Sequence, residues 1–161
     1  MTAHKRPLVI GIGNPHAGDD AVGLLVAQAL RRAGYDGEVV ENPGIAADLI
    51  SLFEGHDHVI LIDACRSDAA PGTIHQFDAN DAPLPPFLTP VSSHGYGVGE
   101  AVELARALGM LPAICMVWAI EGVEFGVGTQ MTPAVARTIA KCVAGIGDIS
   151  ALSGSLPPHW M

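Results

Sequence analysis

The chain has 161 residues, the length of one ordinary domain, and is long enough to bury most of its apolar surface. Hydrophobic residues make up 49% of the sequence, which excludes a disordered chain, while aromatic residues make up only 5%. The formal net charge of −9, with only eight Lys and Arg residues, disfavours binding to a phosphate backbone. We therefore expect a folded domain with a core of Val, Ile, Leu and Ala and with no nucleic-acid partner.

No apolar run approaches the roughly 20 residues that a membrane-spanning helix requires. The first apolar run, Leu8–Ile12, is also too short for the hydrophobic region of a secretion signal, so we expect a cytoplasmic protein with no membrane contact. The three cysteines have no disulfide or CxxC spacing, and Cys115 and Cys142 lie in apolar runs typical of a core. Cys65 lacks a His–Asn or His–Asp pair, placed by a motif, that would activate it as a nucleophile.

Short apolar runs alternate with segments of helical spacing along the whole chain. In chain order, we expect a strand at Leu8–Ile12, a helix over 22–33, a strand at Glu38–Glu41, a helix at Ala46–Phe53, a strand at His58–Ile62, an edge strand at Gly72–Phe77, a loop over Asp78–Pro90, a helix at Gly97–Leu108, a strand at Ile114–Ile120 and a helix that begins at Thr132-Pro133.

Strands that are separated by helices of this length predict right-handed crossovers. The expected fold is therefore α/β, with a three-layer architecture in which a mainly parallel, twisted sheet has helices on both faces. We find no internal repeat or linker, so residues 1–149 are expected to form a single domain. Residues 150–161 are rich in Gly, Ser and Pro and are expected to form a flexible tail.

Three polar segments follow apolar strands or precede a helix, namely Asn14–Asp20, Asp63–Ser67 and Ser92–His94. In open parallel sheets, ligands bind beyond the carboxyl ends of the strands, where these segments would meet. Carboxylates and an imidazole from separate loops leave open positions on a divalent cation, as in a catalytic or transient metal site. The sequence therefore predicts such a site at this edge of the sheet.

Each candidate residue also has an ordinary structural explanation. Asp19 and Asp20 stand at the start of a predicted helix, and we assign Asp19 to helix capping. Asp63 ends an apolar strand, where a carboxylate needs a partner or a wet cleft. A lone histidine such as His94 is often only a structural group. His16, His56, His58 and His75 have no ligand-like spacing, so we expect surface or turn roles for them.

Several short motifs occur in a fixed order along the chain. They are Gly11-Ile-Gly-Asn14, Asp19-Asp20-x-x-Gly23, Asp63-Ala64, Ser93-His94-Gly-Tyr-Gly97 and a glycine-containing segment that starts at Gly122. As a set, from about Leu8 to Ile146, they resemble the hydrogenase maturation proteases. The resemblance implies an endopeptidase that acts on the precursor of a nickel–iron hydrogenase large subunit and removes its C-terminal extension after nickel insertion.

The resemblance also implies roles for three residues. In the family, nickel held by the substrate serves as the recognition signal, and an acid, an aspartate and a histidine contact it. At the matching positions these are Asp20, Asp63 and His94, which we take as both the metal ligands and the catalytic residues. Nickel would then arrive with the substrate and would not be a resident cofactor. Either a side chain or the metal could activate the attacking water.

Two positions depart from the family pattern. The acid in the first loop is often Glu in the family and is the shorter Asp20 here. Asn42–Ala46 stands where many members carry a Gly-Gly-Thr turn that is thought to help select the substrate. The hydrogenase subtype therefore stays open. We expect a monomer that docks transiently on the precursor.

Two other functions compete with this interpretation. Peptidyl-tRNA hydrolases also open with Gly-x-Gly-Asn-Pro, but they need a basic surface and a downstream His–Asn pair, which this acidic chain does not show. A nickel-sensing assembly factor that does not cleave its partner would keep Asp20, Asp63 and His94. The sequence barely separates this second alternative from a protease.

Overall fold

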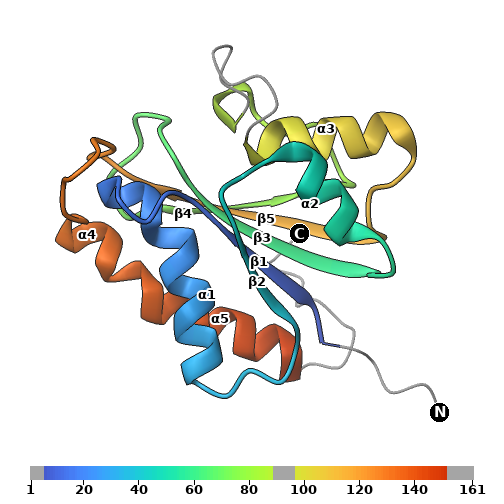
Figure 1. The fold of residues 1–161 in the computed structure, drawn as a ribbon, viewed down its shortest axis with the longest axis horizontal. Helices are drawn as coiled ribbons and strands as arrows, with labels where there is room; N and C mark the ends of the chain where they lie inside the picture. The colour runs from blue at the N-terminus through green and yellow to red at the C-terminus, as the bar shows by residue number, and fades with distance from the viewer. Residues whose placement is uncertain (1–5, 89–96, 152–161) are drawn as a thin grey trace.

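The structure is a computed structural model that describes residues 6–88 and 97–151. A single sheet with the strand order β2-β1-β3-β5-β4 lies between two helical layers (Figure 1). Its strands are β1 (Leu8–Ile12), β2 (Val39–Asn42), β3 (His58–Cys65), β4 (Ile74–Asp78) and β5 (Ile114–Glu121). The helices are α1 (Val22–Arg32), α2 (Ala46–Phe53), α3 (Val98–Leu108), α4 (Pro133–Ala136) and α5 (Thr138–Ala151), with short 3-10 helices η1 (Gly18–Ala21) and η2 (Pro86–Leu88).

The sheet is parallel except at one edge. β1 pairs in parallel with both β2 and β3, and β3 pairs in parallel with β5. β4 follows β3 without an intervening helix and pairs with β5 in the antiparallel direction, so it forms the edge strand. These pairings confirm the expected α/β fold and the expected edge strand.

Two apolar cores hold the layers together, one on each face of the sheet. Helices α2 and α3 cover one face, and α1, α4 and α5 cover the other (Figure 1). Alternate residues of β3 enter opposite cores, because Leu61 packs with α2 and α3 whereas Ile60 and Ile62 pack with α1 and α5. A strand that is buried on both sides explains the continuous apolar run in the sequence.

Helix α1 begins in backbone contact with the ends of two strands. A Cβ atom on Gly23 would lie 2.3 Å from the carbonyl oxygen of Ile62 and 2.4 Å from that of Ile12. Only glycine permits this approach, because no side chain separates the helix from the sheet. The contact brings η1, which carries Asp19 and Asp20, next to β3.

Several boundaries differ from those expected, and three of the differences affect the site or the limits of the domain. β3 continues to Cys65, so Asp63 lies inside the strand, opposite Ala119 of β5, and not at its end. The helix that begins at Thr132-Pro133 is divided into α4 and α5, and α5 extends through Ala151. The expected tail therefore starts no earlier than residue 152, and residues 152–161 lie outside the described part of the chain. Among the described helices, none is long and apolar enough to cross a membrane.

We predict that Gly23→Ala destabilises the protein by about 1–3 kcal/mol, because the added methyl group would overlap two backbone carbonyls that cannot easily move. Gly147→Ala is the matched control: Gly147 lies in α5, nothing lies near its hypothetical Cβ, and the change should stabilise the protein by about 0.5–1 kcal/mol. Urea unfolding followed by circular dichroism measures both effects. Equal stability of Gly23→Ala and the unaltered protein would contradict the close contact.

Candidate functional site

Asp20 and Asp63 come together near the carboxyl ends of β1 and β3. Asp20 lies in η1 and Asp63 in β3, and both are partly buried. The backbone N–H of Asn14 donates to Oδ2 of Asp20 at 2.9 Å, and the N–H of Ala64 donates to Oδ1 of Asp63 at 2.8 Å. The negative charge of Asp20 acts on Asp63, as expected for carboxylates that share one site.

Both carboxyl groups are poorly stabilised as anions. Burial raises the pKa of Asp20, against the effect of the Asn14 hydrogen bond. Burial and the nearby charge of Asp20 raise the pKa of Asp63 well above its ordinary value. A divalent cation between the two groups would relieve this repulsion, and carboxylate oxygens are suitable ligands for it. The pair is therefore suited to bind a cation or to exchange protons.

Asp19, the neighbour of Asp20, has a different environment. Its side chain is fully buried, with 0% exposure. Oδ2 accepts the backbone N–H groups of Val123 at 2.9 Å and Glu124 at 3.0 Å, and Oδ1 accepts the N–H of Thr132 at 2.7 Å. The Thr132 hydroxyl also donates to the carboxylate, at 3.0 Å to Oδ1. Burial by itself would raise the pKa of Asp19, but the hydrogen bonds lower it overall.

The expected capping role of Asp19 is therefore wrong. Neither η1 nor α1 has a side-chain hydrogen bond at its N-cap. The Asp19 carboxylate instead joins η1 to the segment between β5 and α4, and its own N–H donates to the carbonyl of Glu124 at 2.7 Å. Thr132 is the N-cap residue of α4, as expected, but its hydroxyl bonds Asp19 and not its own helix.

The loop after β2 meets the start of α3 at the same sheet edge. Oδ1 of Asn42 accepts the N–H groups of Gly44 at 2.8 Å and Ile45 at 3.1 Å, which closes a tight turn. The N–H of Gly97 donates to the carbonyl of Gly44 at 2.7 Å. Gly97 stands three residues after His94, which lies outside the described residues. The expected meeting of His94 with the two carboxylates therefore stays a prediction.

A second polar cluster lies on the same face of the sheet, and the sequence did not reveal it. The carboxylate of Glu121 is nearly fully buried and accepts hydrogen bonds from the hydroxyl of Ser67 at 2.5 Å and from its N–H at 2.7 Å. His75 Nε2 lies 3.2 Å from Oε1 of Glu121, so the expected surface or turn role of His75 is wrong. A charged residue at the end of an apolar strand, the signal that pointed to Asp63, also applies to Glu121.

Cys65 belongs to this cluster and is not an activated nucleophile. Its thiol is buried and donates to Oε1 of Glu121 at 3.7 Å. Burial and the charge of Glu121 raise the pKa of Cys65 to about 12, so the thiol stays protonated.

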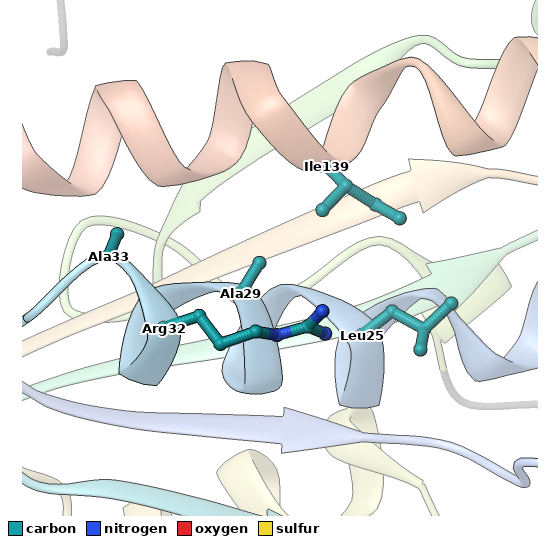
Figure 2. A pocket seen from close by; sticks show the side chains of 5 residues that line it. All are labelled: Leu25, Ala29, Arg32, Ala33 and Ile139. Carbon is teal, nitrogen blue, oxygen red and sulfur yellow. The ribbon is translucent and has the colours of Figure 1, made fainter.

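A surface hollow between two helices lies away from these groups. It has a volume of about 550 Å³ and is open between α1 and α5 (Figure 2). Arg32 extends along α1 toward Leu25, and Ile139 faces them from α5 (Figure 2). The lining offers one guanidinium among apolar side chains, without a group that could act as an acid, a base or a metal ligand. We therefore place the candidate active site at Asp20 and Asp63.

We predict that Asp19→Asn destabilises the protein by about 2–4 kcal/mol, because an amide nitrogen would face buried N–H donors. Folding lowers the pKa of Asp19, so its ionised carboxylate adds to the free energy of unfolding. This stabilisation is complete above the unfolded-state pKa of about 3.9, and it is lost as the pH falls through the lower pKa of the folded state. Urea unfolding at pH 7 and at lower pH measures this. The exposed Asp48→Asn in the first turn of α2 is the control. A loss that is equally small in both variants would contradict the role of Asp19.

For Asp63→Asn, we predict the opposite sign. Because folding raises the pKa of Asp63, its ionisation opposes folding once the pH exceeds the unfolded-state pKa, and the cost grows until the folded group is also ionised. The metal-free variant should therefore unfold at a higher urea concentration than the unaltered protein at pH 7. The difference should vanish at low pH, where both states are protonated. A variant that is less stable at pH 7 would show that the two acids do not repel each other.

Comparisons with known proteins identify the family of the chain. The family model described as hydrogenase maturation protease matches residues 25–149, a range that starts after Asp20 and includes Asp63. The hydrogenase 2 maturation protease of Escherichia coli K12 is 31% identical over 140 residues, which is 83% of this chain and 84% of that protein.

Solved structures of similar fold carry related names. The hydrogenase maturating endopeptidase HybD from E. coli superposes with a TM-score of 0.74 at 24% identity, over 92% of this chain and 94% of that one. The [NiFe] hydrogenase maturation protease HybD from Thermococcus kodakarensis gives a TM-score of 0.67 at 21% identity, over 90% of this chain and 99% of that one. At these identities the structures support the fold. The family model and the sequence relative show that the chain is an endopeptidase of the hydrogenase maturation protease family.

Proposed function

We propose that the chain cleaves the precursor of a nickel–iron hydrogenase large subunit and removes its C-terminal extension after nickel has been inserted. The observation that carries the proposal is the pair of repelling carboxylates, Asp20 and Asp63, near the carboxyl ends of β1 and β3. Family membership supplies the class of reaction, which is peptide-bond hydrolysis. The proposed site of action is the cytoplasm, with the chain as a monomer.

The proposed recognition signal is nickel that the precursor already holds. Asp20 and Asp63 would offer carboxylate oxygens, and His94 would offer an imidazole nitrogen, a ligand set that suits a borderline divalent ion. Before the precursor docks, the two carboxylates repel each other, which favours arrival of a cation. An enzyme of this kind would discriminate a nickel-loaded precursor from an empty one by charge.

Hydrolysis requires a proton to move twice. The oxygen of a water molecule forms a bond to the scissile carbonyl carbon, the carbon–nitrogen bond breaks, and the leaving amine takes up a proton. A carboxyl group with a raised pKa accepts the proton from water and returns it to the amine more readily than an ordinary aspartate at neutral pH. The raised pKa of Asp63 describes the site before nickel arrives. With nickel bound, we assign the role to the carboxylate oxygen of Asp63 that does not contact the ion.

The test is incubation of the purified chain with a nickel-loaded large-subunit precursor, followed by mass measurement of the product. We predict release of the C-terminal extension, and no cleavage of the nickel-free precursor. Asp63→Asn, Asp20→Asn and His94→Ala should each lower the cleavage rate by at least about a hundredfold, because each removes a group that acts at the reacting centre.

The exposed Asp48→Asn should cleave at the unaltered rate and controls for the change in net charge. A cognate precursor that binds through Asp63 but stays full length would favour a nickel-sensing assembly factor without protease activity. Equal cleavage by His94→Ala and the unaltered chain would remove His94 from the site.

A further inference from the structure

Three potential metal ligands converge where β3, β4 and β5 lie side by side. Sγ of Cys65, Nε2 of His75 and Oε1 of Glu121 all lie within 4.8 Å of one another. The separation between Sγ and Oε1 is 3.7 Å, and that between Nε2 and Oε1 is 3.2 Å. The three atoms are therefore close enough together to contact one metal ion after small side-chain adjustments.

The sheet itself sets this geometry. Cys65 and Glu121 are direct partners in the parallel register of β3 and β5. His75 pairs with Ala119 on the other side of β5, two residues from Glu121, so its side chain emerges on the same face. All three ligands therefore stand on strands and not on loops, and the site is formed without any rearrangement of the backbone.

The donor atoms fit zinc better than other biological cations. Zinc takes thiolate sulfur at about 2.3 Å, imidazole nitrogen at about 2.0–2.1 Å and carboxylate oxygen at about 2.0–2.2 Å in a tetrahedral arrangement. Ligand atoms in such a tetrahedron lie about 3.3–3.7 Å apart, close to the separations of Glu121 from Cys65, 3.7 Å, and from His75, 3.2 Å. Sγ of Cys65 and Nε2 of His75 lie within 4.8 Å, so one of these side chains would move slightly toward the ion. The Ser67 hydroxyl, 3.5 Å from Nε2 of His75, is a further oxygen beside the three ligands.

Burial and charge agree with an ion at this position. Cys65 is 5% exposed and Glu121 is 1% exposed, whereas the His75 side chain is 21% exposed and offers a route from solvent. A zinc ion bound by one thiolate and one carboxylate forms a neutral unit, which suits a buried site. Binding would displace the thiol proton of Cys65 to solvent, and the hydrogen bond from that thiol to Glu121 would be replaced by two metal bonds.

We propose that Cys65, His75 and Glu121 bind one zinc ion in a structural site that fastens the edge strand β4 to β3 and β5. This site is separate from the Asp20 and Asp63 pair and does not depend on the proposed protease function. Without a metal ion, the same atoms form the hydrogen bonds described above. We therefore expect the ion to stabilise a chain that also folds without it.

Cobalt(II), a spectroscopic substitute for zinc, tests the proposal on the full-length, metal-free chain. We expect one equivalent to produce the intense near-ultraviolet absorption of a thiolate–cobalt bond, and zinc to displace it. Cys65→Ser should abolish this absorption, and Cys142→Ala should retain it, because Cys142 lies in the apolar core beneath α5. Asp63→Asn should also retain it, since carboxylate and imidazole ligands alone give no thiolate signal.

Zinc should also raise the melting temperature of the unaltered chain, and His75→Gln should weaken the zinc affinity at least about tenfold. If Cys65→Ser does not fold, the zinc affinity of His75→Gln tests the proposal instead. His75 is the most exposed of the three ligands, so its replacement should disturb folding least. A folded chain with no thiolate–cobalt absorption and no zinc-dependent rise in melting temperature would overturn the proposal and leave a hydrogen-bonded cluster only. Absorption that persists in folded Cys65→Ser would overturn it as well.

Discussion

The buried carboxylate of Asp19 is the interaction on which the candidate site depends. It accepts hydrogen bonds from Val123, Glu124 and Thr132, so it fastens the 3-10 helix after β1 to the segment after β5. These two segments leave the sheet at strands that are not neighbours, because β3 lies between β1 and β5. A single carboxylate thus spans the carboxyl edge of the sheet, and it holds Asp20, the next residue, over Asp63.

Adjacent aspartates consequently carry opposite electrostatic roles. The Asp19 carboxylate accepts hydrogen bonds from buried donors, which lower its pKa, so it contributes to stability as an anion. Asp20 and Asp63 are short of donors, lie near each other, and have raised pKa values. A fold that keeps two repelling acids at one edge gives up some stability for function, as active sites often do. The cation that we propose for this site would come from the substrate.

The sequence was sufficient for the architecture and for one part of the site. Apolar runs alternating with helical spacing predicted the parallel sheet, and the alternation in Gly72–Phe77 correctly predicted an edge strand. The role of Asp19 could not be predicted, because its hydrogen-bond donors stand more than a hundred residues later in the chain. Likewise, His75 and Glu121 are 46 residues apart and meet only through the antiparallel register of β4 and β5. His94 was proposed from its place before a predicted helix and from the family resemblance, and it lies outside the described residues.

The central claim is that Asp20 and Asp63 contact nickel carried by the precursor. X-ray absorption at the nickel edge, recorded on the nickel-loaded precursor alone and in complex with the chain, tests it directly. The account predicts that oxygen ligands at about 2.0–2.2 Å appear when the complex forms and are lost in a complex with Asp63→Asn. Nickel coordination that is identical in the free precursor and in a demonstrated complex with the unaltered chain would contradict it.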